Sequence, residues 1–355
     1  MLNIIMKNRQ LNFLLLTIIF VHLFSSTVFS QRKTLPKVEV LTSGTKTSLR
    51  GLSVVNNNIV WVSGSNGTVG KSSNGGKNWK WMTVKGFEKN DFRDIEAFDA
   101  NTAIIMAIAD PGYILKTTDG GESWKVVYEN KTKGIFMDAM EFRNMSDGVV
   151  IGDPVDGRFF IAKTYNNGET WTELSADERP IADSSEAFFA SSGTNIRYLY
   201  NKSIVYGSGG KNSRFFYDDR VMQVPMTKGK ETAGTNSIAV YDKFNKRIAN
   251  KIIIVGGDFT ADSEKENNCY YSTNGGVSWK RPKNPPGGYR SCVEFLDEDN
   301  VVTCGLNGVD YSFDGGKNFY PISKEGFHVC RFARVGNTVY LAGGNGKIGK
   351  LVWGE

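Results

Sequence analysis

The chain alternates short apolar runs with polar turns and shows almost no helical periodicity. Runs such as Asn58-Ile-Val-Trp-Val and Lys251-Ile-Ile-Ile-Val are rich in β-branched residues, which is typical of strands. The segments between them carry Gly, Asn, Asp and Ser, the residues that tight turns favour. This pattern predicts an all-β fold of short strands joined by hairpin turns.

One turn sequence occurs five times, in the frame Ser/Thr-x-Asp/Asn-x-Gly-x-Ser/Thr/Asn-Trp/Phe. In each copy we expect Asp or Asn to cap the turn, Gly to adopt φ > 0, and the aromatic residue to anchor the hairpin to its neighbour. The five copies contain the pairs Asn74 and Trp79, Asp119 and Trp124, Asn166 and Trp171, Asn274 and Trp279, and Asp314 and Phe319. We interpret these residues as structural.

The spacing of the motif predicts a radial repeat. Successive copies are 45, 47, 108 and 40 residues apart, and the interval of 108 leaves room for one repeat that has lost the motif. Such a period, with short strands throughout, is typical of a β-propeller with one four-stranded antiparallel blade per repeat. In the fourth repeat Phe215-Phe-Tyr-Asp-Asp-Arg stands in place of the motif. We expect the blades at residues 48–82, 91–130, 136–175, 186–227, 236–284, 289–323 and 327–353.

The last repeat has length for only three strands. Residues 37–42 form an unassigned strand before the first blade. If this strand pairs with the last blade, it closes the ring and removes an exposed sheet edge. The sequence therefore predicts a seven-bladed β-propeller closed by its N-terminal strand, with six or eight blades as alternatives.

The first thirty residues have the pattern of an export signal. Lys7 and Arg9 precede an apolar stretch over residues 11–24, which is short for a membrane span, and small residues Val28 and Ser30 follow. We expect cleavage before Gln31, with an uncleaved anchor as the alternative. Residues 31–355 would then be one propeller domain, periplasmic or secreted, monomeric and without a transmembrane segment.

Charge and cysteine usage narrow the function classes. Without Lys7 and Arg9 the chain has 41 basic and 37 acidic residues, a net charge of +4 that is spread evenly, which argues against nucleic-acid binding. Cys269, Cys292, Cys304 and Cys330 lack metal-ligand spacing. They can be buried thiols or disulfides, and the sequence leaves both interpretations open.

Aligned repeats place polar residues at the start of each innermost strand, where side chains should converge at the mouth of the central channel. The expected mouth residues are Arg50, Arg93, Met137, Glu186, Arg290 and His328. Loops on the same face add the rim residues Asp110, Asp153, Asp156, Arg158 and Asp258. Arginine suits carboxylates and phosphates, so this face is a candidate binding surface. The alternative is that these charges pair with one another as structural ion pairs.

The sequence gives no complete catalytic or cofactor motif. The glycine-rich turns at residues 208–210 and 305–308 lie in hairpins without a following helix, and only one histidine remains after the signal. A calcium site at Asp153 and Asp156, or a glycosidase pair drawn from Asp153, Asp156 and Glu186, can be named, but nothing in the sequence pairs these residues. We therefore expect no catalytic residues, no cofactor and no metal.

The five turn motifs resemble the Asp-box, or BNR, repeats of sialidase-type propellers. The catalytic residues of sialidases do not carry over, because Phe92-Arg-Asp-Ile lacks the motif of the first sialidase arginine. Phrases such as Trp61-Val-Ser-Gly-Ser-Asn-Gly, Gly288-Tyr-Arg-Ser-Cys and Gly326-Phe-His-Val-Cys resemble the photosystem II assembly and stability factor family more closely, over nearly the whole mature chain.

That resemblance implies a non-enzymatic propeller that docks a protein through its arginine-rich face. The expected partner is another envelope or secreted protein. A sialidase-like glycan-binding protein or degenerate glycoside hydrolase is the alternative. An oxidoreductase, as relatives are labelled, comes last because no cofactor motif supports it.

Overall fold

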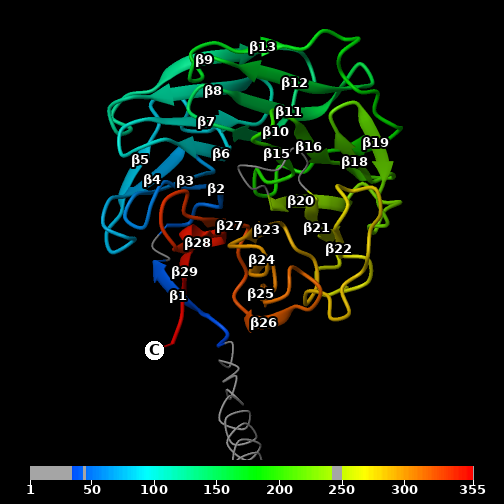
Figure 1. Ribbon diagram of the computed structural model, residues 1–355. Helices are drawn as coiled ribbons and strands as arrows, with labels where there is room; N and C mark the ends of the chain where they lie inside the picture. Colours follow the sequence, from blue (N-terminus) through cyan, green and yellow to red (C-terminus); the bar gives the residue numbers. More distant parts are fainter. Residues whose placement is uncertain (1–33, 43–44, 242–249, 355) are drawn as a thin grey trace, which may run out of the picture. The chain divides into compact units, whose positions relative to one another are not determined.

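The computed structural model describes residues 34–42, 45–241 and 250–354. These residues form 29 strands and one short 3-10 turn, Gly344–Gly346, and the strands assemble into seven sheets. Figure 1 shows the sheets as blades arranged in a ring. The seven-bladed all-β architecture is therefore confirmed. The predicted export signal lies outside the described residues, and within them no helix is long and apolar enough to cross a membrane.

The first three blades have four strands each, which run outward from the axis in chain order. Blade one contains β2 (Leu49–Val54), β3 (Val60–Gly64), β4 (Thr68–Ser72) and β5 (Lys80–Thr83). Blade two contains β6 (Phe92–Ala97), β7 (Ala103–Ala107), β8 (Gly112–Thr117) and β9 (Lys125–Asn130). Blade three contains β10 (Met137–Phe142), β11 (Gly148–Val155), β12 (Arg158–Thr164) and β13 (Thr172–Glu173).

Blades four to seven vary this plan. Blade four contains β15 (Ile196–Tyr198), β16 (Ile204–Gly207), β18 (Arg214–Tyr217) and β19 (Arg220–Gln223). Blade five is a five-stranded sheet of β14 (Glu186–Ala187), β17 (Gly209–Gly210), β20 (Ala233–Tyr241), β21 (Lys251–Asp258) and β22 (Cys269–Ser272). Blade six contains β23 (Cys292–Phe295), β24 (Val301–Gly305), β25 (Gly308–Ser312) and β26 (Tyr320–Ser323). Blade seven contains β27 (Val329–Phe332), β28 (Val339–Ala342), β29 (Ile348–Val352) and β1 (Lys37–Thr42).

The start of blade four differs from the prediction. Its first strand is β15, ten residues after the predicted start at Glu186. Glu186 lies instead in β14, which pairs with β17, and β17 joins blade five through the pair Gly209 and Gly234. The prediction fails because residues 188–193 leave the sheet before the first strand of blade four begins.

Blade four also shows what replaces the lost turn motif. Tyr217 pairs with Arg220 across a two-residue turn, and Asp218 adopts φ +49°. The Asp218 carboxylate accepts a hydrogen bond from the Ile204 amide at 2.9 Å, and the Asp218 amide donates to the Ile204 carbonyl at 3.0 Å. A single aspartate thus joins this turn to the second strand of the blade.

The ring is closed by pairing of the two ends of the propeller. Strand β1 runs antiparallel to β29, with partners from Lys37 and Val352 to Thr42 and Ile348 (Figure 1). The sheet order β1-β29-β28-β27 makes blade seven four-stranded. The predicted closure by the N-terminal strand is confirmed.

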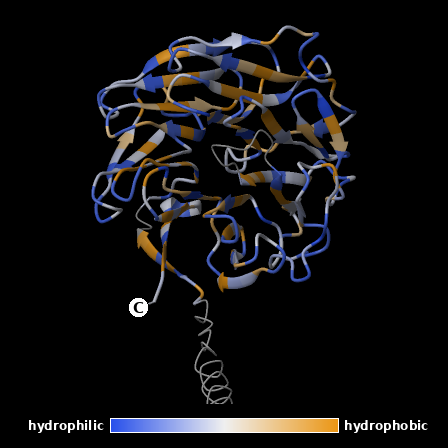
Figure 2. Ribbon diagram, in the orientation of Figure 1, coloured by the Kyte–Doolittle hydropathy of each residue, from blue (hydrophilic) through white to orange (hydrophobic). Residues whose placement is uncertain are grey.

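The five turn motifs share one hydrogen-bonding pattern. In blade two, Thr117 Oγ1 donates to Asp119 Oδ1 at 2.8 Å and accepts from the Gly121 amide at 3.0 Å. Asp119 Oδ1 also accepts from the Ser123 amide at 3.0 Å. The equivalent bonds occur in the other four copies. Figure 2 shows apolar positions along the strands and polar positions in many of the loops that join them, as expected if blades pack on one another through their strands.

Candidate functional site

The propeller has two distinct faces. With the strands of a blade counted outward as first to fourth, the first strand starts on the face that also carries the loops between second and third strands. We call this the loop face. The turns between third and fourth strands, including the five motifs, lie on the opposite face, which we call the box face. The predicted mouth and rim residues belong to the loop face.

A β-bulge occurs at the same place in four innermost strands. In these blades the pairing of the first strand with the second skips one residue of the first strand. The skipped residues are Arg50 in blade one, Arg93 in blade two, Asp138 in blade three and Asn236 in blade five. A bulged residue is freed from the ladder and its side chain is redirected. The mouth position in blade three is therefore Asp138, one residue after the predicted Met137, which is fully buried in an apolar cluster.

A segment between blades three and four fills the channel. Residues 188–193, which we call the axial segment, bind to other blades mainly through their backbone. The Arg50 guanidinium donates to the Ser191 carbonyl at 3.2 Å, and Arg93 donates to the Ala190 carbonyl at 3.5 Å. Deeper in the channel, Arg331 donates to the Gly193 carbonyl at 3.4 Å. Further bonds join the segment to blades three, five and six. The axial segment therefore lies across the channel, and we call the region on its loop-face side, around Arg50 and Arg93, the basin.

Arg50 and Arg93 lie together in this basin but differ in their partners. Arg93 Nε bonds Asp91 Oδ2 at 2.8 Å. Within the described part of the chain, Arg50 forms no ion pair and donates only to the Ser191 carbonyl. Burial, and then the positive charge of Arg93, lower the pKa of Arg50. Arg50 is thus a largely buried cation without a carboxylate, an arrangement that costs stability unless an anion compensates it.

His328 joins this group as a neutral side chain. Its Nε2 lies 3.3 Å from Ser48 Oγ, and its Nδ1 is buried without a hydrogen-bond partner among the described residues. Burial, Arg50 and Arg93 lower the pKa of His328 to about 3. The imidazole therefore adds a polar group to the basin, and no positive charge at neutral pH.

The other two predicted mouth residues are engaged in internal ion pairs. Arg290 is directed to the third strand of blade six, where its Nε bonds Asp310 Oδ2 at 2.6 Å and both side chains are about 2 % exposed. Glu186 is fully buried and accepts from Arg214 Nε at 2.8 Å and from Ser208 Oγ. Arg290 and Glu186 therefore form structural ion pairs, which was the alternative to a binding role.

Two of the rim residues support neighbouring backbone. Asp153 accepts a hydrogen bond from the Phe188 amide at 2.8 Å, at the start of the axial segment. It lies beside Asp138, and burial raises the pKa of Asp153 to about 6. Burial, together with Asp153, raises the pKa of the Asp138 carboxyl. Arg158 donates to the Arg179 carbonyl at 2.8 Å.

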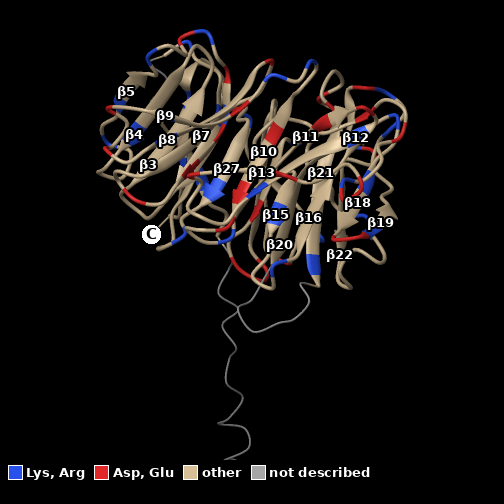
Figure 3. Cartoon of the chain, turned by 90° about the horizontal axis from the view of Figure 1, so that it is seen from above, with Lys and Arg blue, Asp and Glu red and all other residues tan. Residues whose placement is uncertain are grey.

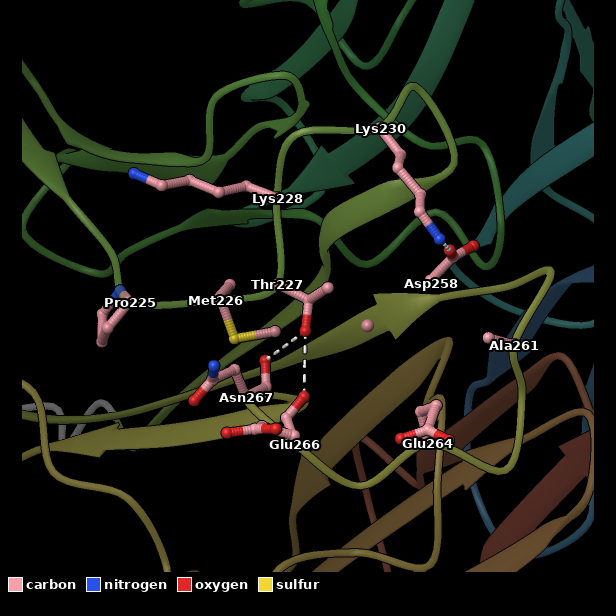
Figure 4. Close-up of a pocket in the computed structure, with 11 residues that line it drawn as sticks. Pro225, Met226, Thr227, Lys228, Lys230, Asp258, Ala261, Glu264, Glu266 and Asn267 are labelled. Carbon is pink, nitrogen blue, oxygen red and sulfur yellow. Dashed lines mark hydrogen bonds and ion pairs between the residues drawn. The ribbon is translucent and has the colours of Figure 1, made fainter.

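The remaining rim residues are two exposed aspartates and one buried one. Asp110 and Asp156 are exposed. Asp258 accepts a hydrogen bond from Thr232 Oγ1 at 2.8 Å. It also accepts from Lys230 Nζ at 2.9 Å (Figure 4). Asp153, Asp156 and Glu186, which the sequence offered as possible glycosidase carboxylates, are not paired among the described residues, because Glu186 is bound to Arg214 and Asp153 accepts from the Phe188 amide.

Figure 4 shows a groove of about 520 Å³ beside the enlarged loop of blade five. Its walls are residues 225–230 and 257–267. Exposed Lys228 and Lys230 lie on one wall, and exposed Glu264 and Glu266 on the other. Because both signs of charge are present, the groove shows no preference for an anion or a cation.

The box-face end of the channel holds an ionic cluster that the sequence analysis missed. Arg197 bridges Glu141 at 3.5 Å and Glu294 at 3.2 Å, and Arg334 pairs with Glu96. Glu96, Glu141, Glu294, Arg331 and Arg334 line a cavity of about 110 Å³. Aligning the innermost strands beyond their first residues could have found most of the cluster, since these strands carry all its charges except Arg334, which follows β27 (Figure 3). Three acidic and three basic side chains balance, so we assign this end a structural role.

All four cysteines are free and buried. Cys292 lies opposite Cys304 on the neighbouring strand of blade six. Cys292 Sγ lies 3.2 Å from the Cys330 carbonyl of blade seven. Of the two interpretations left open, the structure shows buried thiols.

Comparison with known proteins agrees with this architecture. The BNR/Asp-box repeat family matches residues 270–281, the turn motif of blade five. A solved structure titled "YCF48 bound to D1 peptide" has a TM-score of 0.63 at 14% identity, covering 90% of this chain and 97% of that one. YCF48 from Cyanidioschyzon merolae has a TM-score of 0.61 at 18% identity, covering 88% and 98%. The WD40 β-propeller domain of Doa1 has a TM-score of 0.58 at 12% identity, covering 91% and 98%.

No curated protein matches the sequence. At these identities the structural likeness shows the fold alone. The chain carries a BNR/Asp-box repeat on a propeller with the fold of YCF48.

Proposed function

We propose that this chain is an exported β-propeller that binds another protein through the basin on its loop face. Arg50 carries the proposal. It is a largely buried guanidinium with no carboxylate partner among the described residues, and it is bound to the axial segment on the loop face of the propeller. An acidic group of a partner would complete its hydrogen bonds and compensate its charge.

Two further observations support a protein partner. The axial segment fixes the backbone beneath Arg50 and Arg93, so both guanidinium groups are held before a ligand arrives. The solved structure of YCF48, which shares this fold, is described as bound to a D1 peptide. Export rests on the pattern of residues 1–30, which makes another envelope or secreted protein the expected partner.

Crosslinking in the native cell envelope, followed by capture of the chain, tests the proposal. The variant carries Arg50→Glu and Arg93→Glu. A matched control carries Lys77→Glu and Lys317→Glu, which change the net charge equally at exposed motif positions on the box face. We expect one dominant protein that the arginine variant loses and the lysine variant retains. Equal capture by both variants would show that the partner binds outside the basin. Recovery of no protein would overturn the proposed function.

A further inference from the structure

An exposed aromatic side chain lies on the loop face near Arg50. Phe259, in the loop after β21, is 39 % exposed although it is large and apolar. Its ring contacts Tyr289 edge to face, with centroids 6.3 Å apart, and contacts Phe189 in the same way at 6.2 Å. We call these three rings the aromatic shelf. They come from blade five, blade six and the axial segment.

The shelf and Arg50 belong to one surface. The buried Tyr289 hydroxyl lies 3.3 Å from Ser191 Oγ and donates to Asn236 Oδ1 at 2.8 Å. The carbonyl of the same Ser191 accepts the hydrogen bond from Arg50. One residue of the axial segment therefore contacts both the cation and the base of the shelf.

The position of Phe259 is fixed by hydrogen bonds on both sides of it. Its amide donates to the Thr232 carbonyl at 3.2 Å. The preceding Asp258 accepts from Thr232 Oγ1 and from the Thr260 amide at 3.0 Å. It also accepts from Lys230 Nζ (Figure 4). A rigid aromatic ring loses little conformational freedom when a ligand covers it, so its contact area contributes efficiently to binding.

We infer that the basin binds a protein segment in which a carboxylate stands next to a large apolar side chain. The carboxylate bonds Arg50 and the apolar side chain covers Phe259. This inference rests on the proposed function and names the chemistry of the partner. A protein segment is favoured because it offers both groups side by side, whereas a neutral glycan leaves Arg50 without an anion and an acidic glycan offers no large apolar group for the shelf.

Four synthetic decapeptides of Gly and Ser, with Asp-Phe, Asp-Ser, Asn-Phe or Asn-Ser at the centre, provide the probes. Binding to the chain without residues 1–30 is followed by fluorescence anisotropy at low salt. We expect the Asp-Phe peptide to bind most tightly, and replacement of either residue to weaken binding about tenfold. Phe259→Ser should abolish the preference for Phe and keep the preference for Asp, and Arg50→Gln should do the reverse.

Val277→Ser is the matched control, because Val277 is a 66 % exposed apolar residue on the box face of the same blade. It should leave all four affinities unchanged, and an unchanged melting temperature will show that each variant folds. The Phe259→Ser variant is also used in the envelope capture, where we expect at least a tenfold loss of the partner.

Any of four outcomes would overturn the inference. In the first, peptide binding requires Asp and Arg50 and is unaffected by Phe259→Ser. In the second, the Phe259→Ser variant retains the captured partner. Either result would show that the aromatic shelf is not part of the binding site, and would leave the proposed function intact. Retention of an acidic polysaccharide that depends on Phe259 assigns the surface to carbohydrate. Absence of both peptide binding and any captured protein rejects the proposed function itself.

Discussion

Single residues at the loop face divide into those that hold the fold and those left for a ligand. Arg290 and Arg50 illustrate the division, because both were candidates from the sequence. Arg290 is buried against Asp310 and also bonds the side chain of Asn307 at 2.7 Å. Arg50 has one carbonyl acceptor. Arginine thus has a structural role at Arg290 and a proposed binding role at Arg50, and mutation can separate the two roles.

We predict that Arg290→Met destabilises the protein by about 3–5 kcal/mol, because it leaves the Asp310 carboxylate buried and unpaired. Arg50→Met should change stability by less than about 1 kcal/mol, because the loss of one hydrogen bond is offset by the removal of a buried charge that has no carboxylate partner. Urea denaturation measures both. The double change Arg290→Met with Asp310→Asn should recover part of the loss, and equal effects of Arg290→Met and Arg50→Met would contradict the assignment.

The carboxyl pair at the start of the axial segment makes stability depend on pH. Burial raises the pKa of Asp153 to about 6 in the folded protein, above its value of about 4 in the unfolded chain. Between about pH 4 and pH 6 the unfolded chain therefore releases a proton that the folded protein keeps. By linkage, stability falls as pH rises through this window, by up to about 3 kcal/mol, and the loss stays constant above it.

We predict that Asp153→Asn removes this slope, because asparagine cannot ionise and still accepts the Phe188 amide. The measurement is the free energy of unfolding of variant and parent at pH 4, 5, 6 and 7, taken as a difference so that groups away from Asp153 and its neighbour Asp138 cancel. Asp156→Asn, at an exposed position of the same loop, is the control. A difference that stays constant with pH would show that Asp153 does not titrate in this window.

At the scale of elements, the turn motif acts as a contact between blades as well as a hairpin cap. Its second glycine faces the preceding blade: a Cβ on Gly276 would lie 2.4 Å from the Phe215 ring of blade four. Gly276 has φ +84°, and Gly134, in a loop with open space around it, has φ +83°. The two positions share one backbone conformation and differ in packing.

We predict that Gly134→Ala costs about 1 kcal/mol, the strain of a Cβ at positive φ. Gly276→Ala should cost about 3 kcal/mol or more, because steric overlap with Phe215 adds to the same strain. Chemical denaturation of the two variants compares them directly. Similar losses would mean that blade four moves aside at little cost.

Blades that keep the motif could be placed from the sequence, and blade four could not. Five of the repeats carry the turn and its spacing, which identify the hairpin between third and fourth strands. Blade four lacks this reference, so its first strand was placed at Glu186 instead of Ile196. Nothing local in residues 188–193 distinguishes a segment that enters the channel from one that continues a sheet.

At the scale of the whole molecule, the number of blades and the ring closure followed from repeat length alone. The candidate site was harder to predict, because a β-bulge in the innermost strands shifts side chains by one residue. Asp138 replaced Met137 for that reason, and Phe259 was missed because no repeat corresponds to the enlarged loop of blade five. The repeated features of the sequence predict the blades, whereas the candidate site consists of residues at which single blades differ from the repeat.

The ring itself depends on β1. Its Val38 and Leu41 pack against the apolar cluster of blades six, seven and one, and its backbone covers the edge of β29. A chain that begins at residue 45 would expose that edge, and exposed edges pair with other chains. We predict that the chain that begins at residue 45 melts about 10 °C or more below a chain that begins at residue 34. The shortened chain should also associate in a concentration-dependent way.

Differential scanning calorimetry and light scattering measure these two effects. A synthetic peptide of residues 34–44, added in excess, should restore both the melting temperature and the monomer, because it can add to β29 as an extra strand. A peptide of the same composition in scrambled order should not. If the chain that begins at residue 45 stays monomeric with an unchanged melting temperature, β1 is dispensable and the other six blades close the ring without it.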